Sequence, residues 1–393
     1  MRTAVLVDVV RTASGRGKPG GALSGVHPAD LLAQTITGLL GRHQLDPARI
    51  DDVIAGCVSQ AGDQALNVAR TASLVAGLPE SVPGTTIDRQ CGSSQQAVHF
   101  AAQGVMAGAY DAVLAVGVES MSRVPMGYTS VDQDPVRGPL SRRYPDGLVG
   151  QGISAELIAA RWQLSRAELD AYSARSHERA ARTAAAGGFD GEIVPVQVAG
   201  GGHARDETIR SGTTVEGLGQ LRPSFQDDAL GARFPQIGWS ITPGNSSPLT
   251  DGAAAALLMS EELAGSLGLR PRARFHEFAV VGSDPLLMLT GVVPATEKVL
   301  ERAGLGVADL DAYEVNEAFA PVPLAWQHEF KADPDRLNAR GGAIALGHPL
   351  GASGVRILAT LVASLEATGG RYGLQTMCEG GGMANAMIVE RLG

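Results

Sequence analysis

The sequence predicts an α/β fold made of two similar halves, with a segment of different character inserted between them. Short apolar runs alternate with helical stretches, a pattern typical of mostly parallel sheets that carry helices on both faces. The order of elements before residue 120 is similar to the order after residue 270, which indicates an internal duplication. A chain of 393 residues also exceeds what one compact core usually accommodates, so two or three domains are expected.

Each half is expected to contain strands and helices in a similar order. In the first half we predict strands at residues 4–7, 53–58 and 111–117, a helix at 28–40 and a second helix that opens at Cys91. In the second half we predict strands at 273–281, 312–315, 372–378 and 384–391, and helices at 294–303 and 351–365. Cys91 and His348 then stand at equivalent helix starts, so we expect them to meet across a pseudo-twofold axis.

We therefore divide the chain into three parts. The first core half comprises residues 1–120 together with 248–270, and the second core half comprises residues 271–393. Between them, residues 121–247 hold a polar stretch (129–143), an arginine-rich helix (166–186) and a glycine-rich run (199–202). The motif Asn-Ser-Ser at 245–247 marks the return into the core.

Composition excludes several classes of protein. A net charge of −9 argues against nucleic-acid binding. Three cysteines without a Cys-x-x-Cys pair, and no His-Glu-x-x-His or Walker sequence, give no basis for a disulfide framework, a metal site or nucleotide hydrolysis. No apolar run approaches the roughly 20 residues that span a bilayer, and the N-terminus lacks a secretory signal. We expect a cytoplasmic protein without a membrane partner.

Cys91 lies in the segment DRQCGSS (88–94), directly before an alanine-rich apolar stretch. A thiol at the start of a helix faces free N–H groups and the positive end of the helix dipole, and both favour a thiolate. The sequence therefore predicts a nucleophile with a lowered thiol pKa. The small residues after Cys91 leave room for a substrate carbonyl. Cys57, in an apolar strand without such a motif, is interpreted as structural.

Three more motifs place reactive side chains among glycines or small residues: NEAFA (316–320), GHPLGASG (347–354) and CEGGG (378–382). His348 is the candidate general base, because the ordinary pKa of histidine lies near neutrality. Cys378, with an ordinary thiol pKa of about 8.5, is the candidate acid and base for carbon. Turns and a helix cap at Asn316 would explain each motif singly, but not both thiols and the histidine together.

With these motifs in this order, the chain resembles the thiolases (acetyl-CoA C-acyltransferases) over essentially its whole length. The resemblance implies a duplicated core of five layers, α-β-α-β-α, with residues 121–247 as a loop domain that covers coenzyme A. It implies that Cys91 is the nucleophile, and that the amides of Cys91 and Gly380 form one oxyanion hole. His348 and a water held by Asn316 form the other.

The same resemblance implies the contacts of the substrate. Ser247 corresponds to a serine that touches the pantetheine, and Arg222 to a position beside the CoA nucleotide. Met288 and Phe319 would line the acyl pocket, where ordinary core packing is the alternative. Leu289 stands where a glycine is common, and together with residues 125–150 it is expected to alter the pocket. These features look more like degradative thiolases of high-GC bacteria, some of which take bulky or steroid side-chain esters.

The expected activity is cleavage of 3-ketoacyl-CoA by CoA to acetyl-CoA and a shortened acyl-CoA, in fatty-acid or steroid side-chain β-oxidation. Biosynthesis of acetoacetyl-CoA is the close alternative, because it is the same reaction reversed. A ketosynthase of the same general fold is disfavoured by the second cysteine, Cys378, and a non-catalytic acyl-CoA binding protein would be expected to lack Cys91 or His348. Coenzyme A is expected as a co-substrate, without a permanent cofactor, in a homodimer or homotetramer.

Overall fold

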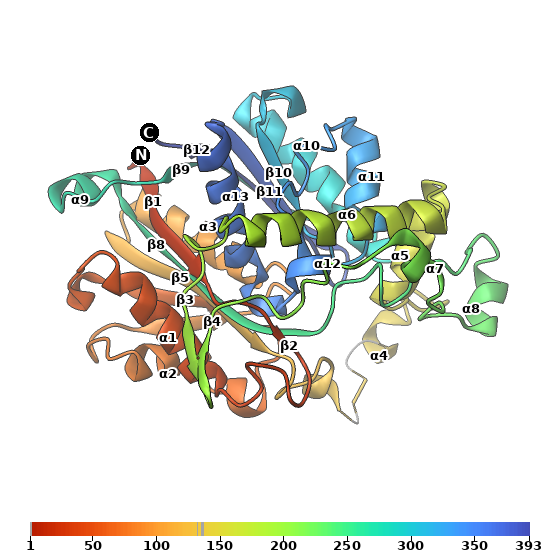
Figure 1. Cartoon of the computed structure of the whole chain (residues 1–393), viewed down its shortest axis with the longest axis horizontal. Helices are drawn as coiled ribbons and strands as arrows, with labels where there is room; N and C mark the ends of the chain where they lie inside the picture. The colour runs from red at the N-terminus through yellow and green to blue at the C-terminus, as the bar shows by residue number, and fades with distance from the viewer. Residues whose placement is uncertain (1, 132, 135–136) are drawn as a thin grey trace.

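The computed structural model describes residues 2–131, 133–134 and 137–393 (Figure 1). Its main sheet has the strand order β10-β11-β12-β9-β1-β8-β5-β3-β4, and β2 pairs with β8. The strands are β1 (Ala4–Arg11), β2 (Gly15–Arg16), β3 (Asp52–Gly56), β4 (Gly84–Ile87), β5 (Ala112–Ser120), β8 (Thr250–Ser260), β9 (Ala273–Gly282), β10 (Ala312–Val315), β11 (Tyr372–Glu379) and β12 (Met383–Arg391). The predicted strand at 312–315 is confirmed at both ends.

The prediction of mostly parallel strands is wrong. Among the described strands of this sheet, only the pairs β3–β4, β3–β5 and β10–β11 are parallel. One cause is β8, which the sequence reasoning did not recognise and which runs antiparallel between β1 and β5. Another is the three-residue connection at 380–382 between β11 and β12, because so short a link permits only antiparallel pairing.

The five expected layers are present. Helices α1 (Pro28–Gly41) and α2 (Val68–Val75) pack on the outer face of the first half, together with β1, β3, β5 and β8. Helices α3 (Ser93–Ala107) and α13 (Ser353–Thr368) share a core with strands of both halves, and so form the central layer (Figure 1). Helices α10 (Val292–Ala303) and α11 (Pro321–Phe330) pack on the outer face of the second half.

Only two residue pairs, Val5 with Arg274 and Leu6 with Ala273, join the two halves of the sheet through β1 and β9. Because this link is so short, the half-sheets can lie on opposite sides of α3 and α13. The central position also explains why the stretch Leu350–Thr368 is so apolar. By length (19 residues) and mean hydropathy (1.3) alone it is long and apolar enough to cross a membrane, contrary to the sequence expectation, but 78% of its most apolar window is buried inside the protein.

The inserted part contains α4 (Arg137–Leu140), α5 (Gln151–Arg161), α6 (Arg166–Ala185), the hairpin β6 (Val196–Val198) and β7 (Gly201–His203), α7 (Val215–Gly219) and α8 (Asp228–Arg233). Two short helices belong to the core: α9 (Glu261–Ser266) and α12 (Ala343–Leu346). Helix α6 is capped by reciprocal hydrogen bonds between Ser165 and Glu168. It docks on the second half through Tyr172 and Ser176, which donate hydrogen bonds of 2.8 and 2.7 Å to Glu317.

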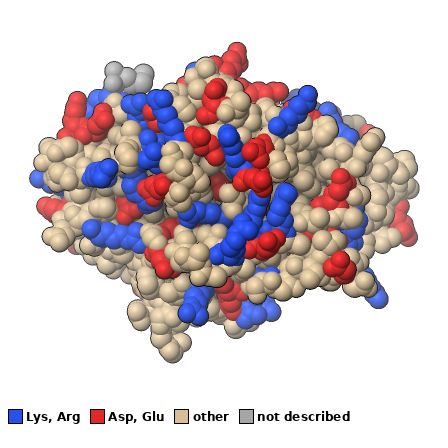
Figure 2. Space-filling view, turned by 45° about the horizontal axis from the view of Figure 1, so that its top comes forward, with Lys and Arg blue, Asp and Glu red and all other residues tan. Residues whose placement is uncertain are grey.

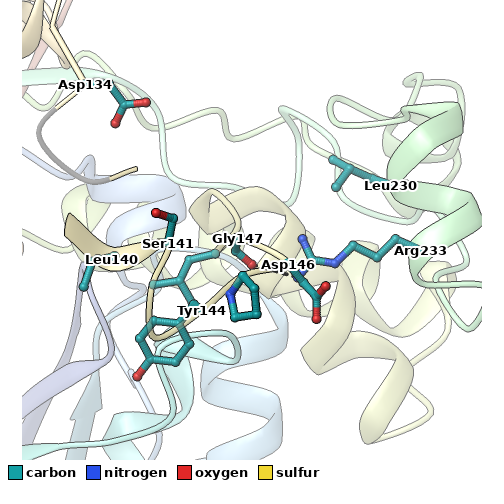
Figure 3. A pocket seen from close by; sticks show the side chains of 10 residues that line it. Asp134, Leu140, Ser141, Tyr144, Asp146, Gly147, Leu230 and Arg233 are labelled. Atoms are coloured by element: carbon teal, nitrogen blue, oxygen red, sulfur yellow. Dashed lines mark hydrogen bonds between the residues drawn. The ribbon is translucent and has the colours of Figure 1, made fainter. Parts of the chain in front are cut away.

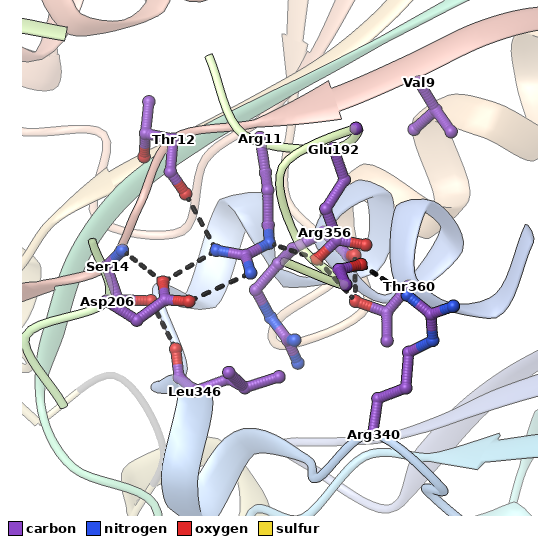
Figure 4. A network of polar contacts seen from close by, with 12 residues as sticks. Val9, Arg11, Thr12, Ser14, Glu192, Asp206, Arg340, Leu346, Arg356 and Thr360 are labelled. Atoms are coloured by element: carbon purple, nitrogen blue, oxygen red, sulfur yellow. Dashed lines mark hydrogen bonds and ion pairs between the residues drawn. The ribbon is translucent and has the colours of Figure 1, made fainter. Parts of the chain in front are cut away.

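A buried ion cluster ties the inserted part to the first half (Figure 4). The Arg11 guanidinium is fully buried and donates to Glu192 at 2.8 Å and to Asp206 at 2.7 Å. Asp206 also accepts the Ser14 amide at 2.8 Å, and the Ser14 hydroxyl donates to the carbonyl of Leu346. Leu346 ends α12, two residues before His348. The cluster therefore supports the segment that carries this histidine.

Candidate active site

Cys91 lies two residues before α3, whose N-cap is Gly92. Gln90, directly before it, has a φ of 48°, a left-handed conformation that few non-glycine residues adopt. Ser93 fixes this turn, because its hydroxyl donates to the carbonyl of Gln90 at 2.6 Å and accepts the Arg89 amide at 2.9 Å. The sharp turn places the thiol at the helix start, where it is 3% exposed.

His348 is buried between α12 and α13, and two hydrogen bonds define its tautomer. The Ser353 hydroxyl donates to the carbonyl of Pro349 at 2.9 Å, so it accepts from Nδ1–H of His348 at 2.6 Å. Nε2 then carries the lone pair, and Nδ2 of Asn316 lies 3.4 Å from it. Leu350, two residues beyond the histidine, packs in one apolar cluster with Cys91. The structure thus brings the Cys91 turn and the His348 segment together.

Asn316 and Cys378 lie at the ends of the neighbouring strands β10 and β11. The backbone N–H of Asn316 donates to the carbonyl of Thr376 at 3.1 Å. The side-chain Oδ1 of Asn316 is buried without a hydrogen-bond partner among the described residues. Cys378 is fully buried and lies close enough to Cys91 for the charge of one thiol to raise the pKa of the other. The four predicted catalytic side chains therefore converge.

The predicted lowering of the Cys91 pKa is wrong, and the pKa values of Cys378 and His348 also depart from their ordinary values. Burial, followed by the charge of Glu379, raises the pKa of the Cys91 thiol to about 12. Burial also raises the pKa of Cys378 well above its ordinary value. For His348, burial and then Arg356 lower the pKa to about 3. These shifts favour the neutral forms of both thiols and of the imidazole near pH 7. Nε2 of the histidine is then unprotonated, with Nδ2 of Asn316 as its neighbour, and no thiolate is preformed.

Glu119, at the end of β5, is a site residue that the sequence reasoning missed. Its buried carboxylate accepts the amides of Val58, Ser59 and Gly351 at 2.8 to 3.0 Å, and the Gln64 side chain at 3.0 Å. A Cβ on Gly351 would lie 2.6 Å from the carbonyl oxygen of Val118, so only glycine permits this approach. The carboxylate thereby joins the first half to the His348 segment. A glutamate inside an apolar strand was its only sequence signal.

The predicted substrate residues occupy different settings. Ser247 is half-buried, and its amide and hydroxyl both donate to the carbonyl of Ala318, at 3.0 and 3.1 Å. Phe319 follows Ala318 in the sequence. Its ring contacts that of Phe225 edge to face, with ring centroids 6.1 Å apart. Met288 is buried with a φ of 25°, whereas Arg222 is exposed. Gly380 is half-buried, and a Cβ there would lie 2.8 Å from Oε1 of Gln90.

Two cavities are lined mainly by residues of the inserted part. The larger, about 570 Å³, is lined by residues 140–141 and 144–148 together with Asp134, Leu230 and Arg233 (Figure 3). The smaller, about 270 Å³, shares Leu148 and Arg233 and extends to Leu286, two residues from Met288. Of the stretch 125–150, which is expected to shape the pocket, residues 132 and 135–136 lie outside the described residues. Among those described, no cluster of three potential ligands for a metal ion occurs.

A duplicated α/β core that brings Cys91 and His348, ahead of its central helices, together with Cys378 at the end of β11 defines an acyltransferase acting on thioesters. Family models for the N-terminal and C-terminal domains of thiolase match residues 4–262 and 269–391. The chain therefore belongs to the thiolase family.

Its relatives include a steroid 3-ketoacyl-CoA thiolase, FadA6, of Mycobacterium tuberculosis, which is 48% identical over 402 residues and covers 100% of this chain and 95% of the relative. A 3-ketoacyl-CoA thiolase of Vibrio vulnificus is 43% identical over 404 residues, covering all of both chains. Among solved structures, the acetyl-CoA acetyltransferase of Bacillus anthracis matches with a TM-score of 0.88 at 35% identity, covering 100% of this chain and 99% of the other.

Proposed function

We propose that the chain cleaves 3-ketoacyl-CoA with CoA, releasing acetyl-CoA and a shortened acyl-CoA through an acyl-enzyme on Cys91. The observation that carries this proposal is the convergence of Cys91, Cys378, His348 and Asn316 at the central helices. Cleavage of a carbon–carbon bond requires a nucleophile that attacks the carbonyl and a separate acid that protonates the departing carbon. The names of the mycobacterial and Vibrio relatives support the degradative direction.

In the first step, the Cys91 sulfur bonds to the keto carbon while its proton passes to Nε2 of His348. Because both groups are neutral at rest, the proton transfer accompanies the attack. The bond from the keto carbon to the α-carbon then breaks, and its electron pair stays on the departing acetyl-CoA enolate. Cys378 supplies the proton that converts this enolate into acetyl-CoA.

In the second step, Cys378 takes the proton of an incoming CoA thiol, and the CoA sulfur attacks the acyl group. Cys91 leaves as a thiolate and regains its proton from His348. Amides of Cys91 and Gly380 are proposed to stabilise one oxyanion, with each such donor worth about 2.7–4 kcal/mol. For the other, the unpartnered Oδ1 of Asn316 is suited to hold a water beside His348.

Coenzyme A enters this proposal as a co-substrate, with Ser247 beside the pantetheine, Arg222 beside the nucleotide and residues 121–247 as its cover. The division into core halves at 1–120 with 248–270 and at 271–393 remains a proposal, as does the cytoplasmic location. Synthesis of acetoacetyl-CoA is the second candidate, favoured by the structural similarity to the acetyl-CoA acetyltransferase of Bacillus anthracis. Steady-state thiolysis of 3-ketoacyl-CoA esters of increasing size tests the proposal, and no turnover of any ester would contradict it.

We expect kcat/KM for medium or bulky 3-ketoacyl-CoA esters to exceed that for acetoacetyl-CoA. Leu289 is buried beside Met288, which is proposed to line the acyl pocket, and we propose that the 570 Å³ cavity receives the far end of a larger acyl group. One methylene is typically worth only about 1–3 kcal/mol in such a pocket, so the preference should be graded. Leu148 lines both cavities, so Leu148→Trp should narrow them, lower kcat/KM for bulky esters and spare acetoacetyl-CoA. Acetoacetyl-CoA as the best substrate would instead support the biosynthetic reading.

We expect the protein to be at least a homodimer in solution, and a homotetramer is compatible with the same surface. Strand β4 ends the sheet order, so one of its edges can pair with another chain. Leu66, Leu74 and Val75, which precede it in the chain, are apolar yet 94%, 46% and 54% exposed, as expected of side chains that an interface covers. The face in Figure 2, by contrast, mixes acidic and basic side chains. Light scattering at micromolar concentration measures the mass, and a monomer would contradict the prediction.

A further inference from the structure

Glu379 is a buried carboxyl beside the nucleophile that the proposed mechanism does not use. It follows Cys378 on β11, and because side chains alternate along a strand, it points to the opposite face of the sheet, into the central layer. There it packs against the start of α3. A Cβ on Gly92 would lie 2.1 Å from Oε1 of Glu379 and 2.9 Å from the side-chain amide of Asn385, so the two side chains press on the residue after Cys91.

The surroundings of Glu379 provide no hydrogen bond to its charge. Asn385 is occupied with the backbone, since its Nδ2 donates to the carbonyl of Gly92 at 3.1 Å. Both carboxylate oxygens of Glu379 are buried without a hydrogen-bond partner in the described part of the chain. An unpaired buried charge is unfavourable, so the protonated form is favoured in this environment.

Two other buried carboxylates, Glu119 and Glu317, are surrounded by hydrogen-bond donors. Glu119 accepts four hydrogen bonds. Glu317 accepts hydrogen bonds from Tyr172, Ser176, Asn338 and the amide of Ile344. Such donors offset part of the cost of burying a carboxylate. Glu379 has no such donors among the described residues, so no hydrogen bond offsets the cost of burying its charge.

The titratable groups around Glu379 come from three places. The segment before α3 contributes Arg89 and Asp88, the helix start contributes Cys91, and its own strand contributes Cys378. Strand β12, which pairs with β11 opposite Glu379, contributes Met383 and Asn385 on this face, neither of which titrates. Asp88 is exposed, whereas Cys91 and Glu379 share a dry environment at one helix terminus. A negative charge on either group therefore opposes a negative charge on the other.

We propose that Glu379 controls the ionisation of the nucleophile: in its neutral form it permits a thiolate on Cys91, and in its charged form it opposes one. The proposal deepens the proposed function, because it rests on Cys91 as the attacking group. Glu379 does not contact the substrate in this proposal. It acts through Cys91, by the effect of its charge on the thiol. This role explains why the Glu379 carboxyl packs against Gly92, the residue after Cys91, without hydrogen-bond donors among the described residues.

The titration behaviour fits this geometry. Burial raises the pKa of Glu379 to about 8, partly offset by Arg89 and reinforced by Asp88. After burial, the charge of Glu379 is the largest cause of the raised pKa of Cys91. Two such groups titrate as a coupled pair. Thiolate formation should rise normally with pH while Glu379 is neutral, pause as Glu379 ionises, and resume only at higher pH.

The test is the pH profile of Cys91 alkylation by iodoacetamide, an uncharged reagent, followed by peptide mass spectrometry. In the wild type, the logarithm of the rate should rise with unit slope and then flatten from about pH 8, where Glu379 ionises. Glu379→Gln keeps the size but not the charge, so its profile should coincide with the wild type at low pH and continue without the plateau. By about pH 9 to 10 it should react about tenfold faster. Glu379→Asp, which keeps the carboxyl, should restore a plateau.

Each alternative outcome decides the question. Parallel profiles, or a shift of Glu379→Gln at all pH values that Glu379→Asp does not reverse, would assign Glu379 a purely structural role and overturn the proposal. Should Glu379→Gln fail to fold, a wild-type profile without a plateau would overturn it equally. Alkylation reports the thiolate and not turnover. An inactive protein with the plateau would therefore contradict the proposed function while leaving the coupling between Glu379 and Cys91 intact.

Discussion

Replacing Cys91 by alanine should reduce acyl transfer to background, whereas Cys378→Ala should still accept an acetyl group on Cys91 from acetyl-CoA. The two thiols lie in one buried site, but in the proposed mechanism only Cys91 attacks the carbonyl. Cys378 acts on the substrate carbon and on the CoA thiol. Its loss should therefore stop complete turnover but not the formation of the acyl-enzyme.

Intact-protein mass spectrometry after incubation with acetyl-CoA measures this difference, and peptide mapping locates the label. Cys57→Ala is the matched control, because Cys57 is also a free, buried cysteine but packs in the apolar core of the first half. It should acetylate like the wild type. A label on Cys378 in the wild type with none on Cys91 would reverse the two proposed roles.

The meeting of the Cys91 and His348 segments could be predicted from sequence, because it depends on local patterns. Both lie before apolar helices in halves of similar order, and the structure places those helices together. The Ser94 hydroxyl, in the first turn of α3, accepts the Val355 amide of α13 at 3.1 Å. The pairing direction of the strands could not be predicted in the same way. It depends on β8, whose alanine-rich sequence, TDGAAAALLMS, carries few β-branched or aromatic residues.

The ionisation of Cys91 could not be predicted because two opposing effects differ in size. A helix N-terminus is worth about 0.3–1 kcal/mol near the surface. Burial can shift a pKa by about 3–5 units, each equivalent to about 1.36 kcal/mol. A motif reveals the helix start but not the depth at which it lies. Glu379 was overlooked for a similar reason, since its contact with Gly92 requires the folded packing of β11 and β12 against α3.

Replacing His99 by leucine should make the protein markedly less sensitive to mild acid. His99, on α3, is fully buried, and neither ring nitrogen has a hydrogen-bond partner among the described residues. Burial, followed by the charge of Arg89, lowers its pKa to about 3. Between that value and the ordinary histidine pKa of about 6.5, the unfolded chain binds a proton that the folded chain does not, so folding loses free energy as the pH falls. At pH 5 the loss is about 2 kcal/mol.

Other groups act on the same stability curve, so the difference between variant and wild type is the relevant quantity. Burial lowers the pKa of His177 to about 4, and burial and Arg356 lower that of His348 to about 3, which adds to the loss in acid. Burial raises the pKa values of Glu314 and Glu379 to about 8, and these have the opposite sign, because the folded protein binds their protons first. All four contributions are common to wild type and His99→Leu and cancel in the difference.

Urea unfolding of both proteins at pH 7.5 and pH 5 measures this difference. The advantage of His99→Leu over the wild type should grow by about 2 kcal/mol between the two pH values, because leucine has no proton to gain on unfolding. His328→Leu is the matched control, since that ring is exposed at the end of α11 and the same exchange removes no buried imidazole. An equal difference at both pH values would mean that the folded protein admits a proton to His99. The ring would then have access to water or to a partner that its packing against Phe278, with ring centroids 4.8 Å apart, argues against.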